Sequence, residues 1–387
     1  MTSHQPPATS HRPNVIIIGG GIVGAASAYH LARRGARTLL IDRHDAGRAT
    51  DAGAGILSAE TYTGDSDAWF RFALDAAAYY PELIEALQAL SGVDVGYGRC
   101  AKLTVAVGAD ELKHFEKAKQ RVLERQARGA GPTADELHEL TPPVTRERFP
   151  HLADVLGCLH FARSARVDGR RLTAALLHAA RHHGVVERQA SVDELVLEGR
   201  RVTGVVAAGV RVAADCVVIA GGAWSPAFEA QLGVRIPVEP QRGQLVHLRV
   251  ADTNGWPIVE GFRGHYIVPW PDGRVVVGAT RETGSGFAVK TTAAGINEVL
   301  NEAFRTIPAL RQAEIVEARV GLRPVTPDRM PVIGPVPGMD GVLLATGHGS
   351  TGLQLGPYTG RVIADRVLGN GPIDLAPFAV DRFQSSD

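Results

Sequence analysis

The alternation of apolar and polar positions predicts strand–helix units at both ends of the chain. Val15 to Ile18 is a short apolar run that predicts a buried strand. The alanine-rich segment after it predicts a helix, and Thr38 to Ile41 predicts a second strand. Towards the other end, Gly341 to Thr346 predicts a strand and Pro357 to Leu368 a final helix. Strands that alternate with helices in this way favour a parallel sheet.

The middle of the chain predicts mostly strands between a few helices. Helical periodicity marks Trp69 to Leu90, Asp110 to Arg128, Arg170 to His183 and Thr291 to Ala303. The predicted strands are Lys102 to Val107, Ser191 to Leu197, Arg201 to Ala207, Arg211 to Val212, Asp215 to Ile219, Gly243 to Val250, His265 to Pro269, Arg274 to Thr280 and Ile315 to Leu322. This order predicts an α/β protein in which a dinucleotide-binding domain is assembled from separated segments and a second domain is inserted.

Composition excludes several classes of function. The 387 residues carry 41 Lys+Arg and 41 Asp+Glu, so no electrostatic footprint favours nucleic acid or an anionic membrane. No apolar run reaches the roughly 18 residues of a membrane span. Cys100, Cys158 and Cys216 form no CxxC pair, so we expect neither a disulfide framework nor a cysteine zinc site. Residues 1–12 are polar and form no secretory signal, so we expect a flexible tail on a cytoplasmic protein.

A glycine-rich turn carries the first chemical signal. Gly19, Gly21 and Gly24 form GxGxxG between the first predicted strand and helix, and Asp42 ends the next strand. Such glycines allow the turn, the approach of the backbone to a pyrophosphate and close packing of helix on strand. The helix N-terminus then faces the phosphates, and the carboxylate accepts hydrogen bonds from the adenosine ribose. The segment predicts a dinucleotide site that disfavours a 2′-phosphate.

The ordered motifs resemble the glycine oxidase/D-amino-acid oxidase family of FAD-dependent oxidoreductases. They are IIIGGGIVGAASAYHLARRG, AGAGIL, ADCVVIAGGAWS, HYIVPWPDGRVVVGAT, GLRPVTPDRMPVIGP and TGHGSTGLQLGPYTG, which together cover nearly the whole chain. The resemblance implies a doubly wound, Rossmann-like FAD domain and a substrate domain with a mixed or antiparallel sheet. We expect the FAD domain to span 13–85, 151–225 and 320–387, and the substrate domain 86–150 and 226–319.

The resemblance also implies which residues bind FAD. Those around the pyrophosphate and ribose are Gly19, Gly21, Ile22, Val23, Gly24 and Asp42. Those on the flavin side are Arg43, Ala49, Thr50, Gly53, Gly55, Ile56 and Leu57. Further contacts are Val192 at adenine, Ala220, Gly221 and Trp224, and the loop Gly347, His348, Gly349, Ser350, Thr351, Gly352 and Leu353 at the flavin pyrimidine edge. The second GxGxxG, in this loop, lacks a following strand with an acid. It therefore predicts a helix N-terminus at the flavin, whose dipole favours a reduced, anionic ring, rather than a second nucleotide site.

Three residues are expected at the substrate. Arg323 matches the family's carboxylate-binding arginine, and a planar guanidinium binds a carboxylate through two parallel hydrogen bonds. Tyr266 matches the active-site tyrosine that binds the same carboxylate. His348 either steers substrate or oxygen, or hydrogen-bonds the backbone. By contrast, His178 and His182 are spaced like metal ligands but have no third ligand, and we predict no metal site.

The resemblance implies oxidative deamination of a small amino acid or amine, such as a D-amino acid or a glycine-like compound. FAD takes a hydride from the α-carbon at N5, and the imino acid hydrolyses. Gly349 and Ser350 replace an arginine of similar glycine oxidases, so we expect a less cationic site. No cysteine stands near Thr326 to Pro331 to tether the flavin, so FAD is expected to be non-covalent. The alternatives are N-methyl or cyclic secondary amino acids as substrates, oxygen or another acceptor, and a non-catalytic FAD-binding module. The oligomeric state stays open.

Overall fold

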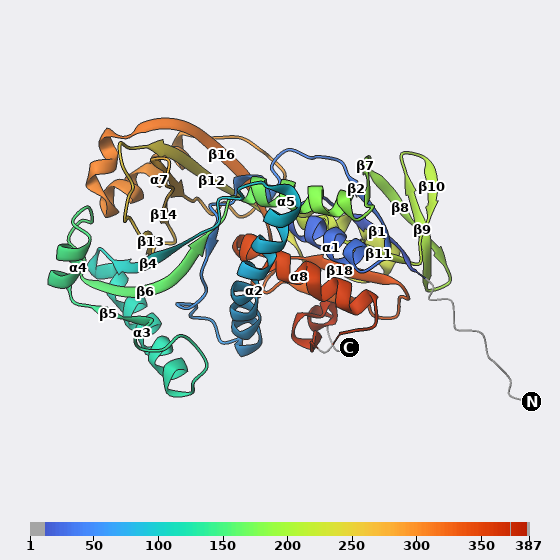
Figure 1. Cartoon of the computed structure of the whole chain (residues 1–387), viewed down its shortest axis with the longest axis horizontal. Coiled ribbons are helices and arrows are strands. Elements are labelled where there is room, and N and C mark those ends of the chain that lie inside the picture. The colour runs from blue at the N-terminus through green and yellow to red at the C-terminus, as the bar shows by residue number, and fades with distance from the viewer. Residues whose placement is uncertain (1–11, 372, 385–387) are drawn as a thin grey trace, which may run out of the picture.

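The computed structural model describes residues 12–371 and 373–384 of the chain (Figure 1). Residues 1–11 of the predicted flexible tail lie outside the described residues. The elements form a six-stranded sheet, a nine-stranded sheet and a small three-stranded sheet, with helices packed on the larger two. Within the part of the chain that is described, no helix has both the length and the hydropathy that a bilayer crossing requires.

The six-stranded sheet holds the predicted strand–helix units. Its order is β17 (Val332–Pro335), β18 (Val342–Thr346), β11 (Cys216–Ile219), β1 (Asn14–Ile18), β2 (Arg37–Asp42) and β7 (Val186–Gln189). The neighbours from β18 to β7 are parallel, and β17 runs antiparallel to β18. Chain order therefore reverses at β1, where an open parallel sheet leaves a crevice at the carboxyl ends of its strands.

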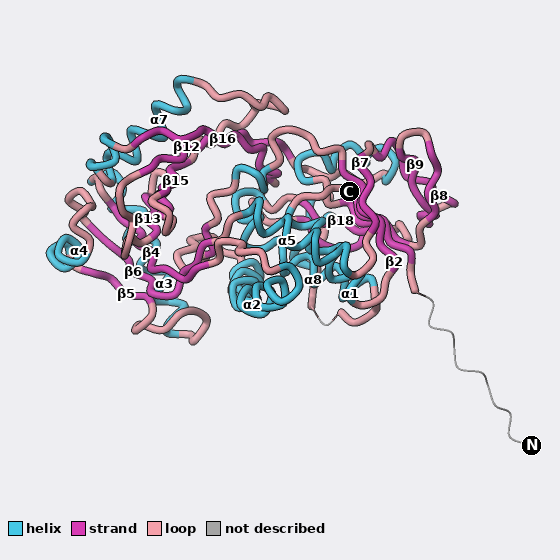
Figure 2. Tube along the Cα trace, turned by 45° about the horizontal axis from the view of Figure 1, so that its top comes forward, coloured by secondary structure: helices cyan, strands magenta, loops and turns pink. Residues whose placement is uncertain are grey.

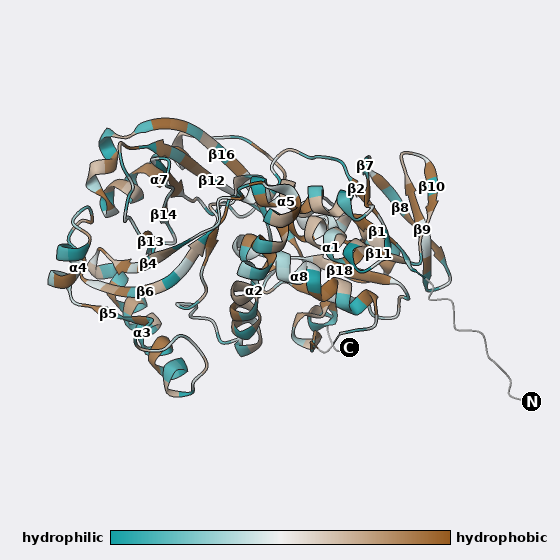
Figure 3. Cartoon of the chain, viewed as in Figure 1, coloured by the Kyte–Doolittle hydropathy of each residue, from teal (hydrophilic) through white to brown (hydrophobic). Residues whose placement is uncertain are grey.

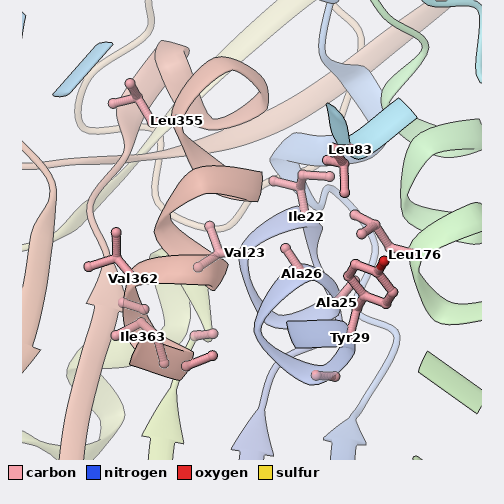
Figure 4. Close-up of a cluster of buried hydrophobic side chains, with 14 of the residues drawn as sticks. Ile22, Val23, Ala25, Ala26, Tyr29, Leu83, Leu176, Leu355, Val362 and Ile363 are labelled. Atoms are coloured by element: carbon pink, nitrogen blue, oxygen red, sulfur yellow. The ribbon is translucent and has the colours of Figure 1, made fainter. Parts of the chain in front are cut away.

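Successive side chains of a strand point to opposite faces of this sheet, and different elements cover the two faces. Val15 and Ile17 join the helices α1 (Ile22–Arg33), α2 (Asp67–Ser91), α5 (Gly169–His182) and α8 (Gly352–Val367) in one core. Figure 4 shows side chains of α1 between those of α8 on one side and those of α2 and α5 on the other. In Figure 2 these four helices gather on one side of the strands.

The opposite face of the sheet is covered by strands. Ile16 and Ile18 pack with residues of the three-stranded meander, which runs β10 (Val210–Ala213), β9 (Arg201–Ala207), β8 (Val192–Glu198). The structure thus confirms the predicted Rossmann-like α/β fold of this unit, with a three-stranded meander on the second face of the sheet.

The nine-stranded sheet builds the second unit. Its order is β16 (Glu314–Val325), β12 (Glu239–Arg249), β15 (Arg274–Gly278), β14 (Tyr266–Pro269), β13 (Ile258–Gly261), β4 (Gly98–Ala106), β6 (Gly157–Arg166) and β3 (Ile56–Leu57), with β5 (Leu137–Leu140) paired to β6. All pairs are antiparallel except β13 with β4, so the sheet is mixed as predicted. The remaining helices are α3 (Leu112–Ala127), α4 (Pro142–Arg148), α6 (Glu229–Leu232) and α7 (Ala293–Thr306). In Figure 3 the helices carry both hydrophilic and hydrophobic stretches, as expected of helices with one buried side.

Several predicted assignments differ from the structure. Strands β3 and β6 were placed with the FAD-binding segments, but β3 pairs with β6, and β6 with β4, in the nine-stranded sheet. Helix α8 begins at Gly352 rather than at Pro357. A proline inside a helix cannot bond the carbonyl four residues earlier, which is that of Leu353. The hydroxyl of Tyr80, buried in α2, donates to this carbonyl oxygen, so a tertiary contact compensates for the missing bond.

Candidate functional site

An elongated cavity runs between the six-stranded and nine-stranded sheets. It encloses about 1690 Å³, counted to its opening at the surface, and both sheets contribute to its lining. One end lies at the turn after β1 and the end of β2, and the other lies at β14 and the end of β16. A concave site between two structural units is where ligands are most often bound.

The glycine turn at the first end is packed too closely for side chains. A Cβ on Gly24 would lie 1.8 Å from the carbonyl oxygen of Gly19. Gly19 itself has a φ of 104°, and its Cβ would meet the backbone of Ala220 at 2.6 Å. The turn therefore brings α1 directly against β1 and leaves bare backbone facing the cavity, as the fingerprint predicted.

Asp42 lies beside this turn, at the end of β2. Its carboxylate accepts a hydrogen bond from the Gly20 N–H, and Arg48 lies 3.7 Å away. The first turn of α1 is tied to the loop that follows β2, because the Ile22 N–H donates to Thr50 Oγ1 at 3.1 Å. These contacts hold an acceptor for ribose hydroxyls next to a helix N-terminus that favours phosphate.

His348 stands where the loop after β18 enters α8. The side chain is buried, and this burial lowers its pKa to about 3, so the ring is neutral at physiological pH. Its Nε2 lies 3.0 Å from Thr359 Oγ1, and that hydroxyl donates to the Leu355 carbonyl at 3.0 Å. Nε2 is therefore the ring's donor, and Nδ1 is left as an acceptor.

Arg323 and Tyr266 meet at the other end of the cavity. Arg323 Nη1 donates to the Thr280 carbonyl at 2.8 Å, and the guanidinium lies over Gly243, where a Cβ would approach it to 2.5 Å. Burial raises the pKa of Tyr266, while the charges of Arg323 and Arg281 lower it, so the phenol keeps its proton. A fork of N–H donors and a phenolic O–H are thus brought together by β16 and β14.

A second arginine at this end was not predicted. Arg281 lines the cavity three residues after β15, and its Nη1 donates to the Gly264 carbonyl at 2.5 Å. The residue is exposed to solvent at this end of the cavity. Its pKa is lowered, first by burial and then by the charge of Arg323. Arg281 therefore adds a positive charge to that of Arg323 at this end of the cavity, and the expectation of a site less cationic than that of similar glycine oxidases stays a prediction.

Most of the predicted cofactor residues line the cavity. Those that do are Gly19, Gly21, Ile22, Val23, Asp42, Arg43, Ala49, Thr50, Gly53, Gly55, Ile56, Val192, Ala220, Gly221, Trp224, His348, Gly349, Ser350, Gly352 and Leu353. Four predicted residues do not line it: Gly24, Leu57, Gly347 and Thr351. Gly24 packs on the turn itself, Leu57 belongs to the core of the helices, and Thr351 Oγ1 donates to the His348 carbonyl.

Sequence reasoning missed Arg281 because it belongs to no glycine motif. A signal was nevertheless present. Two predicted strands, His265 to Pro269 and Arg274 to Thr280, are close enough along the chain to form a hairpin, and the structure pairs Tyr266 with Gly278. An antiparallel hairpin places the residue after the second strand near the beginning of the first.

The structure also places other side chains that the sequence singled out. His178 and His182 are exposed on α5, and the described residues contain no cluster of three or more His, Cys, Asp or Glu side chains suited to a metal. The three cysteines are free. The aromatic residues of α2 are buried in the core that also contains α1: Trp69, Phe70, Tyr79 and Tyr80.

The residues present fit an FAD. A pyrophosphate suits the bare backbone at Gly19 to Gly21, and the ribose suits Asp42. The cavity continues past Thr50 to the start of α8 and on to the two arginines, so its lining would accommodate a long dinucleotide. The fold and this cavity define the class of two-unit flavoprotein oxidoreductases.

Comparison with known proteins gives the family. The FAD dependent oxidoreductase family (DAO) matches residues 14–366, and the chain belongs to it. The chain is 38% identical to the uncharacterized oxidoreductase YurR of Bacillus subtilis over 94% of this chain and 97% of that protein. It is 32% identical to the glycine oxidase of Geobacillus kaustophilus, over 96% and 98%. The structure of iminodiacetate oxidase from Chelativorans sp. BNC1 matches with a TM-score of 0.87 and 37% identity, over 95% and 98%. This protein is therefore an FAD-dependent oxidoreductase.

Proposed function

We propose that this enzyme oxidises the Cα–N bond of a small α-amino acid to an imine, which water then hydrolyses. The observation that carries the proposal is the free guanidinium of Arg323 beside the Tyr266 phenol at one end of the cavity. A bidentate arginine and a neutral phenol form a site for one carboxylate. The glycine oxidase relatives support the same substrate class.

The chain's own residues bind and orient the substrate. Arg323 accepts the carboxylate in its fork, and Tyr266 donates its O–H to a carboxylate oxygen, so the α-carbon is held at a fixed position. Bound FAD supplies the acceptor for the α-hydrogen and its electron pair. The protein contributes geometry and a shielded site rather than covalent chemistry.

No side chain at this end is suited to take the amine proton. The acidic residues that line the cavity, Asp42 and Asp45, stand at the ribose end. His348, with a pKa of about 3, is too weak a base to hold an ammonium proton at neutral pH. The substrate amine must therefore lose its proton to solvent, and the rate should rise with pH through the pKa of that amine.

A second candidate is a secondary amino acid. The similar structure with 37% identity is named iminodiacetate oxidase, and iminodiacetate is a secondary amine. This supports N-substituted glycines as substrates. This substrate would lose the same hydrogen and electron pair as in the first candidate. Hydrolysis of the imine by water would give an oxo acid and the remaining amine. Neither candidate specifies whether oxygen or another acceptor reoxidises the flavin.

The test is anaerobic bleaching of the purified flavoprotein. D-amino acids, glycine, N-methyl amino acids and proline are added one at a time, and loss of the flavin absorbance is recorded. Bleaching by at least one member at a rate that rises with pH is expected. A yellow protein that none of them reduces would reject the proposal and favour a non-catalytic FAD-binding module. Repeating the turnover with oxygen and with a dye separates an oxidase from a dehydrogenase.

A further inference from the structure

A loop of the second structural unit lies against the FAD-binding unit. Residues 283–290, which we call the strap, lie between β15 and α7 and are almost all exposed. The ring of Phe287 lies 5.3 Å from the ring of Trp224. Val289 packs on Gly47, where an added Cβ would lie 2.4 Å from the valine Cγ2. The strap therefore contacts the FAD-binding unit through both of these side chains.

The two contacts lie on opposite sides of the crevice for the cofactor. Trp224 stands after β11 and Gly47 after β2, and these two strands flank β1 in the six-stranded sheet. Trp224 lines the cavity, as do Asp45 and Arg48 on either side of Gly47. A ligand of an open parallel sheet lies beyond the carboxyl ends of the strands, where the strand order reverses. The strap therefore spans the crevice that opens at the glycine turn after β1.

Arg242 of β12 fixes the strap to the nine-stranded sheet. Its buried guanidinium pairs with Glu282, directly before the strap, and its Nη1 donates to the Ala288 carbonyl at 3.3 Å. Gly284 and Gly286 have φ angles of 77° and 55°, and a Cβ on either would meet nothing within 4 Å. These glycines therefore serve the path of the backbone rather than close packing. One buried arginine thus sets the course of the strap across the crevice.

The stability of the fold does not account for the two apolar side chains of the strap. Phe287 is 51% exposed and Val289 is 41% exposed. Neither belongs to a hydrophobic core among the described residues. Isolated apolar side chains on a surface need no function, but these two lie on one strap and contact opposite walls of one cavity. Their contacts join those walls.

We propose that the strap retains bound FAD by tying the two walls of the crevice together. Phe287 acts through Trp224, and Val289 acts through the backbone at Gly47, so both are positioning residues rather than cofactor ligands. FAD leaves when these contacts open, and their strength sets part of its rate of release. This inference goes beyond the proposed function, because it holds whichever amine the enzyme oxidises.

Release of FAD from the purified holoenzyme tests the strap without any turnover. The holoenzyme is diluted, protein is removed by ultrafiltration at intervals, and free FAD in the filtrate is measured by its fluorescence. Phe287→Ala removes one aromatic pair and should speed release about 3- to 10-fold. Phe287→Tyr keeps the ring and should release FAD at nearly the unaltered rate.

Leu123→Ala is the matched control. Leu123 of α3 is an apolar side chain of similar exposure, 49%, and does not line the cavity. This variant should release FAD at the rate of the unaltered enzyme. The thermal midpoint and the initial FAD content are recorded for every variant.

A reversible lock separates retention by the strap from general destabilisation. The Gly47→Cys/Val289→Cys double variant places two thiols where a Cβ of residue 47 meets the Val289 side chain, within reach of a disulfide. The oxidised form should release FAD about 10-fold more slowly than the same protein after reduction, because the joined strap cannot open. Both forms carry the same substitutions, so strain at residue 47, where φ is 81°, affects them equally.

The outcomes decide the role of the strap. Faster release from Phe287→Ala than from Leu123→Ala, with slower release from the oxidised double variant, supports it. An unchanged rate in Phe287→Ala, or an acceleration that Leu123→Ala shares, overturns it. Equal release by the oxidised and reduced double variant also overturns it once thiol titration shows that the disulfide has formed. Where the disulfide does not form, the comparison of Phe287→Ala with Leu123→Ala decides.

Discussion

Replacement of Arg323 by alanine is the most direct test of how the substrate is held. The guanidinium donates one N–H to the Thr280 carbonyl, and its other N–H groups face the cavity. Loss of one partner from a charge-assisted pair in a shielded site costs about 2–5 kcal/mol, or roughly a 30- to 5,000-fold fall in kcat/KM. Arg323 is half-buried, and Arg281 keeps some attraction for an anion, so we expect about 2–3 kcal/mol, a fall of roughly 30- to 150-fold.

The assay is steady-state turnover of the amino acid identified by flavin bleaching. Arg323→Ala should retain flavin content, because Arg323 stands at the end of the cavity away from the glycine turn. Arg323→Lys should recover only part of the loss, since a point charge lacks the fork. Amines without a carboxylate should be nearly indifferent to either change. Turnover of the amino acid by Arg323→Ala at the unaltered rate would refute the carboxylate assignment and leave Arg323 a structural residue.

Three further outcomes are expected. Lys102→Met leaves Glu60 and Glu260 without their buried cation, so urea denaturation should show a loss of about 3–5 kcal/mol; an unchanged urea midpoint would contradict this. Burial lowers the pKa of His348 in the folded protein to about 3. Between about pH 6.5 and pH 3 the unfolded chain therefore binds more protons than the folded protein, so the free energy of unfolding should fall as the pH drops through this range. His348→Gln should make the decline of the denaturation midpoint between pH 7 and pH 5 shallower, and an equally steep decline would show that this histidine is not responsible. Gly243→Ala places a Cβ 2.5 Å from the carboxylate-binding guanidinium and should raise KM without loss of flavin, whereas an unchanged KM would mean that the guanidinium has room to shift.

The sequence by itself determined the nucleotide end of the site, because the contacts there are local. Gly24 packs on Gly19 only five residues away, and Asp42 ends the strand that follows the same helix. Apolar periodicity therefore located β1, α1 and β2, and the glycine spacing located the turn between them. These features depend on backbone sterics within one strand–helix–strand unit.

The substrate end was decided only by the tertiary structure. Arg323, Gly243, Tyr266 and Arg281 lie on or beside four strands, and they meet because β12 pairs with both β16 and β15, and β15 with β14. A shift of one residue in any of these pairings would turn the side chains to the other face, and periodicity alone does not specify register. The start of α8 could not be predicted from the sequence for a related reason. The Tyr80 hydroxyl that donates to the Leu353 carbonyl lies 273 residues away along the chain. Residues brought together by long-range pairing carry no local pattern, so the second arginine became visible only once the strands were in place.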